Sequence, residues 1–206
     1  ASDVYKRQVY VNVDGGPGDM KNTSPAEVEE IMRYAGENPD KSIAVITPFV
    51  NQRILIERGI KENGFEHVVC GTVHAFQGDE KDVVLFSTAL SDRTGKGTYD
   101  WLKNNKELIN VATSRAKDKL ILLADGKELE RLHQGNEDDD LYELVQYVKM
   151  NGESKITEKH ISSRALGIQP FSTETEAAFM KNLTHALENI WLTRNKYTIH
   201  KEVAIS

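Results

Sequence analysis

The sequence predicts an α/β fold in which a mainly parallel sheet is sandwiched by helices. Short apolar, β-branched runs alternate with segments of helical periodicity along most of the 206 residues. Parallel strands need long crossover connections, and the helical segments supply them. Several of the strand-like runs are also apolar throughout, which is typical of strands that are buried on both faces of a sheet.

The first strand is predicted over residues 9–13, where apolar and polar positions alternate, and the glycine-rich residues 14–18 end it. Ser24 and Pro25 then open a helix as the N-cap and the first helical residue. This helix has an apolar stripe at helical spacing, formed by Val28, Ile31, Met32 and Ala35.

Residues 42–46 predict a buried strand that ends at Thr47. A helix from about residue 50 to residue 63 follows, with a stop signal at Gly64 and with buried Ile54, Leu55 and Ile60. Two more strands are expected, over residues 67–73 and 82–89.

Residues 91–100 are predicted to form a loop, and the following helix carries residues 108–115. Residues 119–124 form another buried strand. The acidic run at 137–140 then begins an amphipathic helix that extends to Met150, because carboxylates suit the positive end of the helix dipole. We interpret this run as a solvated helix start and predict no metal site.

Composition sets limits on the functional classes. The net charge of -6 and the pI near 5.6 argue against binding of nucleic acid by overall charge, so any such binding must come from a local surface. Cys70 is the only cysteine, which excludes an internal disulfide and favours a buried, inert thiol. Without an apolar run of membrane-spanning length or a signal peptide, we predict an intracellular, cytoplasmic protein.

Four regions are predicted along the chain. Residues 1–8 look like a non-native leader and are set aside, residues 9–150 form the main domain, residues 151–170 are a polar linker, and residues 171–206 begin a truncated second domain. The chain stops inside an apparent strand, so we expect it to be a piece of a longer protein.

Three segments, at residues 46–53, 71–82 and 110–117, combine polar residues with adjacent predicted strands. Ligands of open parallel sheets bind at the carboxyl ends of the strands, so we expect these loops to converge on one crevice. The segments resemble motifs IV, V and VI of superfamily 1 helicases, especially the branch that contains the nonsense-mediated decay helicase. The resemblance covers about residues 9–125 and implies a second RecA-like motor domain of the P-loop NTPase type.

By this resemblance, Arg53 and Arg115 are two arginine fingers that reach the γ-phosphate of ATP. A guanidinium keeps its charge and presents a planar fork to the transferred phosphoryl group. Arg53 on a helix surface also fits a solvated residue, and Arg115 also fits a structural ion pair with Asp125.

The same resemblance assigns Gln77, Gly78 and Glu80 to nucleotide binding, and its nucleic-acid side to Thr47, Thr72 and His74. A hydroxyl or an imidazole binds a phosphate without reading base sequence. Simpler interpretations stay open: Glu80 as a solvated turn carboxylate, Gln77 as a turn cap and His74 as a structural histidine.

No phosphate loop with its lysine and hydroxyl occurs, and no strand is followed by the Asp-Glu pair that would hold magnesium. The resemblance therefore implies that ATP with magnesium is bound mainly by a first RecA-like domain in the same parent chain. The remaining partner is single-stranded DNA or RNA, and the chain by itself is expected to be inactive.

Residues 170–206 resemble the start of a restriction-endonuclease-like, PD-(D/E)xK domain, in which Glu176 matches the helix glutamate. An ordinary amphipathic helix is the alternative. For the whole protein we expect an ATP-dependent DNA or RNA helicase. The competing hypotheses are a catalytically silent nucleic-acid-binding or regulatory module, and a nuclease whose helicase-like part only positions DNA.

Overall fold

The computed structural model describes residues 7–14, 20–72, 76, 80–135 and 137–157. The chain divides into two compact units, Ala1–Thr157 and Glu158–Ser206. The second unit lies outside the described residues, and with it Glu176 and the predicted nuclease-like segment. No described helix is both long enough and apolar enough to cross a membrane.

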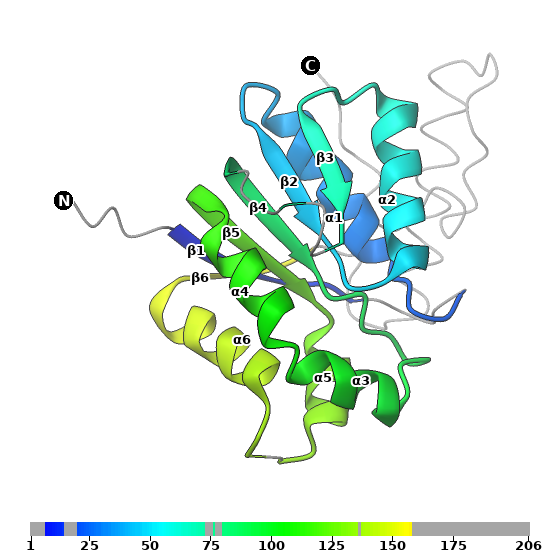
Figure 1. Ribbon diagram of the computed structural model, residues 1–206, viewed down its shortest axis with the longest axis vertical. Coiled ribbons are helices and arrows are strands. Elements are labelled where there is room, and N and C mark those ends of the chain that lie inside the picture. Colours follow the sequence, from blue (N-terminus) through cyan, green and yellow to red (C-terminus); the bar gives the residue numbers. More distant parts are fainter. Residues whose placement is uncertain (1–6, 15–19, 73–75, 77–79, 136, 158–206) are drawn as a thin grey trace, which may run out of the picture. The chain divides into compact units, whose positions relative to one another are not determined.

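Six parallel strands form the central sheet, in the order β3-β2-β4-β5-β1-β6 (Figure 1). Their bounds are β1 Arg7–Asn12, β2 Ile43–Ile46, β3 Val68–Gly71, β4 Lys81–Ser87, β5 Ala116–Ala124 and β6 Glu153–Ile156. The helices between them are α1 Pro25–Glu37, α2 Val50–Asn63, α3 Lys96–Lys103, α4 Lys106–Ser114, α5 Gly126–His133 and α6 Asp140–Asn151.

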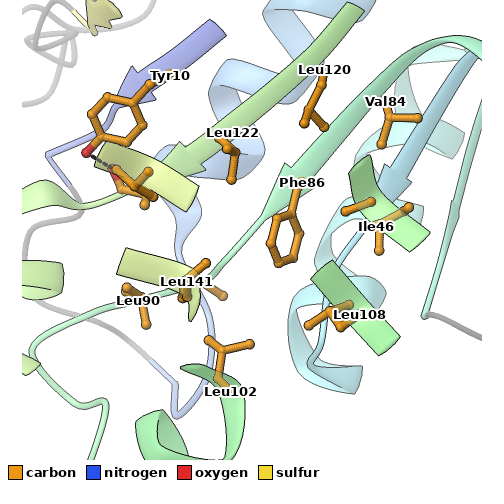
Figure 2. Packing of buried hydrophobic residues seen from close by; sticks show 14 of the residues in the cluster. Tyr10, Ile46, Val84, Phe86, Leu90, Leu102, Leu108, Leu120, Leu122 and Leu141 are labelled. Carbon is orange, nitrogen blue, oxygen red and sulfur yellow. Dashed lines mark hydrogen bonds between the residues drawn. The ribbon is translucent and has the colours of Figure 1, made fainter. Parts of the chain in front are cut away.

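The helices cover both faces of the sheet. Buried residues of α1 and α2 belong to one hydrophobic cluster, whereas those of α3, α4, α5 and α6 belong to the other. Strand β5 contributes alternately: Leu120 and Leu122 face the second cluster (Figure 2), and Ile121 and Leu123 face the first. The predicted fold class is therefore confirmed, including the uninterrupted apolar strands that burial on both faces requires.

Helix α2 has the predicted bounds, and Gly64 ends it in the left-handed conformation with φ 66°. Ile54, however, is 52% exposed, so the prediction of its burial is wrong, and Ile56 is buried instead. Two short helices were not predicted. Helix α3 begins inside the expected loop 91–100, and α5 starts at the N-cap Asp125, whose carboxylate accepts from the N–H groups of two following residues.

Strand β6 lies inside the segment predicted as a linker, where it pairs in parallel with β1 at the sheet edge. Its residues are mostly exposed and polar, which explains why the sequence pattern does not show it. Gly152 allows the approach, because a Cβ there would lie 2.3 Å from the carbonyl oxygen of Gln8. Strand β1 begins at Arg7, within the predicted leader.

The acidic run before α6 does begin the helix, but Asp139 is not solvated. Asp139 is 1% exposed, and its carboxylate accepts from the N–H of Tyr142 at 2.9 Å and from the hydroxyl of Tyr99 at 2.7 Å. The Nδ1 of His133 lies 3.0 Å from the same carboxylate. Asp139 thus joins α3, α5 and α6 through side-chain contacts.

A buried carboxyl group links α1 to the carboxyl end of β4. Glu27 has no exposed surface, and it accepts from the hydroxyl of Ser87 at 2.5 Å, from that of Thr88 at 3.2 Å and from the N–H of Ala89 at 3.0 Å. Ala89 has a φ of 53°, a left-handed conformation that is rare without glycine. Burial outweighs these hydrogen bonds and raises the pKa of Glu27 to about 8.

This pKa predicts an unusual pH dependence of stability. Between about pH 4.5 and pH 8 the folded chain holds a proton on Glu27 that the unfolded chain releases. The free energy of unfolding should therefore fall as the pH rises through this window, by an amount on the order of a few kcal/mol, and level off above it.

Chemical denaturation of wild type and Glu27→Gln across this pH range measures the effect. The variant, which imitates the protonated acid, should lose the slope, whereas Glu29→Gln on the exposed side of the same helix should retain it. Identical slopes in wild type and Glu27→Gln would show that Glu27 titrates as an ordinary carboxylate.

Candidate functional site

Two of the predicted nucleic-acid residues lie together at the carboxyl ends of β2 and β3. Ile46 pairs with Gly71, and the N–H of the next residue, Thr47, donates to the carbonyl of Gly71 at 3.3 Å. Thr72 directly follows Gly71 and is half-buried. Thr47 is fully buried, and its hydroxyl has no hydrogen-bond partner among the described residues. In this conformation only Thr72 of the pair reaches the surface.

Arg53 lies near the start of α2. Its side chain is 38% exposed, and its Nε lies 3.6 Å from a carboxylate oxygen of Glu57, one turn further along the helix. The Nε atom itself is buried and makes no hydrogen bond within the described part of the chain. The guanidinium thus retains donor capacity beside a loose surface ion pair.

The neighbouring residue, Gln52, fixes the start of α2 by hydrogen bonds that the sequence pattern did not indicate. Its Oε1 accepts from the N–H of Ser24 at 2.8 Å, and its Nε2 donates to the carbonyl of Ser24 at 3.2 Å and to the hydroxyl oxygen of Ser87 at 3.0 Å. Ser87 in turn donates to Glu27. The only sequence signal was a glutamine at a helical position that turns out to be fully buried.

Arg115 and Glu80 lie at the opposite ends of the strands, directly before the amino ends of β5 and β4. Arg115 caps the carboxyl end of α4 just before β5, and its carbonyl accepts from the N–H of Lys81 at 3.1 Å. Glu80 is exposed immediately before β4. The Nε of Arg115 is buried and, like that of Arg53, lacks a hydrogen-bond partner among the described residues.

An ion pair between Arg115 and Asp125 is excluded. The two residues flank β5 at its two ends. Nine residues of extended strand separate them by roughly 30 Å. The structural alternative for Arg115 therefore fails, and its charge has no fixed carboxylate partner in the described ion pairs.

The expectation that the three loops converge at the carboxyl ends is wrong for Glu80 and Arg115. Leu122 of β5 is in register with Phe86, and Phe86 with Ile46 at the end of β2. Arg115 precedes Leu122 by about 23 Å of strand, whereas Arg53 follows Ile46 in α2. Strand register therefore places the two arginines far apart along the strand axis.

The segment between β3 and β4 connects the carboxyl end of β3 with the amino end of β4. Within it, Phe76 is buried in the same cluster as Leu108 and Ala112 of α4. His74, Gln77 and Gly78 lie outside the described residues.

The described part of the chain contains no group of three or more His, Cys, Asp or Glu side chains arranged to hold a metal ion. Burial raises the pKa of Cys70 to about 12, which suppresses the thiolate and agrees with an inert thiol.

A family model described as AAA domain matches residues 22–127. Among curated proteins, the chain is 32% identical over 124 residues to "Regulator of nonsense transcripts 1 homolog" of Drosophila melanogaster, covering 55% of this chain and 10% of that protein. It is 34% identical over 120 residues to "RNA helicase Mov10l1" of Mus musculus, covering 52% and 10%. The chain therefore spans about a tenth of these relatives.

A third relative is "DNA replication ATP-dependent helicase/nuclease JHS1" of Arabidopsis thaliana, 32% identical over 105 residues that make up 51% of this chain and 8% of that protein. Among solved structures, the C-terminal domain of a possible DNA helicase from Lactobacillus plantarum has a TM-score of 0.42 at 16% identity. That likeness covers 74% of this chain and 85% of the other. At this TM-score it carries no functional inference.

The Gln52 network predicts a large difference between adjacent positions of α2. Gln52→Leu preserves volume but leaves the buried N–H of Ser24 without a partner and removes one of the two hydrogen bonds of the Ser87 hydroxyl. The free energy of unfolding should fall by about 2–4 kcal/mol. Asn51→Ala removes one exposed hydrogen bond to the carbonyl of Lys21 and should cost less than about 1 kcal/mol. Urea denaturation of both variants measures the difference; similar small losses would show that the network contributes little.

Proposed function

Because the chain belongs to the AAA domain family, we propose that it is the second RecA-like motor domain of an ATP-dependent superfamily 1 helicase acting on DNA or RNA. The relatives named as helicases and the three motif-like segments support this proposal. The observation that carries it is Arg115 at the junction of α4 and β5, where motif VI is expected. Its buried Nε has no hydrogen-bond partner among the described residues.

Arg115 fits an anionic ligand such as ATP with magnesium. Its charge is not neutralised by any described ion pair, and its main chain is fixed by α4 on one side and by Lys81 on the other. Glu80, beside Lys81, would lie near the nucleotide, together with Gln77 and Gly78. ATP would supply the transferred phosphoryl group, and Arg115 would stabilise the charge that develops on it.

Arg53 is the weaker of the two proposed fingers. It lies at the other end of the sheet, and Glu57 competes for its guanidinium. A nucleotide held by the preceding RecA-like domain of the parent would have to span both edges to meet both arginines. We therefore assign the finger to Arg115 first and treat Arg53 as the comparison.

The proposed binding of nucleic acid rests on residues at the carboxyl end of β3. Thr72, a half-buried residue, offers its hydroxyl there, and His74 follows two residues later in the sequence. Such groups bind phosphate without reading bases, which suits a motor that steps along any sequence. Thr47 would contribute only if the turn after β2 opened, since its hydroxyl is buried.

The chain alone should not hydrolyse ATP, because its sequence contains no phosphate loop and no Asp-Glu pair for magnesium. Phosphate release by the purified chain should stay at background with and without single-stranded DNA or RNA. Turnover that depends on nucleic acid and persists after contaminating motors are removed would overturn the proposal that this chain supplies only part of the ATP site.

In the intact parent, Arg115→Lys should fold and bind nucleotide but lose roughly a hundredfold or more in turnover, because lysine lacks the planar fork. Arg53→Lys tests the second finger in the same assay. Arg58→Lys serves as the control, since Arg58 is exposed on α2 and paired with Glu62.

Melting temperature and nucleic-acid-stimulated turnover should be measured on the same preparations. Equal losses for Arg115→Lys and Arg53→Lys would restore the two-finger arrangement. Normal turnover in both would refute the finger assignment and favour a catalytically silent binding module.

A further inference from the structure

Two positive side chains lie near Tyr34 of α1, toward the amino ends of β1 and β5. Arg7 of β1 is in register with Lys119 of β5, and the Nζ of Lys119 lies 5.6 Å from the ring centroid of Tyr34. Lys41, just before β2, and Lys155 of β6 both act electrostatically on Lys119, and Lys155 lies further toward the carboxyl ends of the strands. We refer to Arg7, Lys41, Lys119 and Lys155 as the Tyr34 basic cluster.

The strand cations of this cluster share one face of the sheet. Side chains alternate along a strand, and Val9 and Ile121 belong to the hydrophobic cluster under α1 and α2. Arg7 and Lys119, two positions away in each strand, therefore point to the same face. Lys155 is in register with Val11, which belongs to that face as well.

Direct ion pairs involve only two of these four cations. Arg7 forms an ion pair with Glu153, and the Nζ of Lys41 lies 3.7 Å from Asp118. Two further carboxylates act electrostatically, Asp40 on Tyr34 and Asp82 with Lys41. In the part of the chain that the structure describes, no carboxylate lies within ion-pair distance of Lys119 or Lys155, so neither has a direct ion-pair partner there.

Neighbouring cations disfavour the charge of Lys119 in the free protein. The pKa of Lys119 lies below its ordinary value because of partial burial and because Arg7, Lys155 and Lys41 repel its charge, with Glu153 as the opposing influence. A fold gains nothing from cations that repel one another, and such local conflict is expected where a surface serves a ligand. An anion bound between them would remove the repulsion.

We propose that the Tyr34 basic cluster binds the phosphate backbone of nucleic acid, as a second contact in addition to Thr72, on the sheet face that α1 and α2 cover. With a net charge of -6, the chain can attract a polyanion only through such a local surface. Lys155 lies four residues further along the strand direction than the Arg7–Lys119 pair. The cations thus extend over more than about 13 Å, which suits an extended backbone better than a single small anion.

The contact should be insensitive to base sequence. Lys119 lies over one face of the Tyr34 ring, so that face is not free for a base to stack on. Lysine side chains meet phosphates as point charges, and they position a strand without reading it. The choice of nucleic acid as ligand rests on the proposed function, whereas the anion site itself does not.

The experiment uses the purified chain with two probes, a short single-stranded oligonucleotide of mixed sequence and inorganic polyphosphate. Lys119→Gln/Lys155→Gln should weaken oligonucleotide binding roughly tenfold or more near 0.1 M salt. The slope of log affinity against log salt should fall by about 1.4, or about 0.7 for each lost contact. Lys119→Arg/Lys155→Arg should retain binding. The control Lys127→Gln, which changes an exposed lysine in α5, should retain it as well.

Stability provides the second readout. Without ligand, the melting temperature of the glutamine double variant should equal or exceed that of wild type, because repulsion is removed. Wild type should gain more in melting temperature on addition of either probe. A merely structural pair of lysines would show the reverse, with a lower melting temperature and unchanged binding.

The outcomes separate this inference from the proposed function. If the glutamine double variant binds the oligonucleotide normally while Thr72→Ala does not, the inference fails and the proposed nucleic-acid edge stands. If only polyphosphate binding depends on the two lysines, the assignment to nucleic acid is overturned. If wild type binds neither probe, the inference is overturned, whereas turnover of Arg115→Lys in the parent still tests the motor.

Discussion

The packing of this domain depends on the burial of the Glu27 carboxyl group against the end of β4. Glu27 holds the backbone of Ala89 in a left-handed conformation, and through Ser87 it is linked to Gln52. Gln52 then binds both main-chain groups of Ser24, which caps α1. One connected set of hydrogen bonds therefore fixes the starts of α1 and α2 relative to the central strand of the sheet.

This constraint makes the two edges of the sheet different. At the carboxyl ends of the strands, Glu27, Ser87 and Gln52 are buried and bound to one another, and of the two predicted nucleic-acid residues that the structure describes only Thr72 reaches the surface. Arg115 and Glu80 lie at the amino ends of β5 and β4, and Arg7 and Lys119 lie toward the same ends. These proposed ligand-binding residues thus lie outside the hydrogen-bond network of Glu27.

The sequence predicted the elements whose pattern reflects burial on both faces. Strands β2 and β5 are runs of aliphatic residues, and Gly64 marks the end of α2. The polar edge strand β6 was not predicted, because its residues are mostly exposed and its position depends on backbone pairing with β1. Helices α3 and α5 span eight residues each, too short for a periodic pattern to identify.

The site was predicted less completely than the fold, for a related reason. Motif-like spacing identified Arg115 as a residue of interest, but its edge of the sheet follows from strand register, which a linear pattern does not encode. The burial of Gln52 and of Glu27 could not be foreseen either, since glutamine and glutamate on a helix usually face water. Neither residue matches a catalytic pattern, yet both belong to the hydrogen-bond network that fixes the start of α2, the helix that carries Arg53.

Two features of the domain oppose its stability near neutral pH, and they lie at opposite edges. Burial of Glu27 is unfavourable whenever the carboxyl group ionises, and mutual repulsion disfavours the charge of Lys119. The two hydrophobic clusters offset both costs, because each buried aliphatic side chain contributes about 1.5–3 kcal/mol. Burial of Glu27 lowers stability when the group ionises, but its hydrogen bonds fix the geometry at the start of α2. The contact of Lys119 with the ring of Tyr34 offsets part of the repulsion inside the fold, and the polyanion that we propose as ligand would remove the rest.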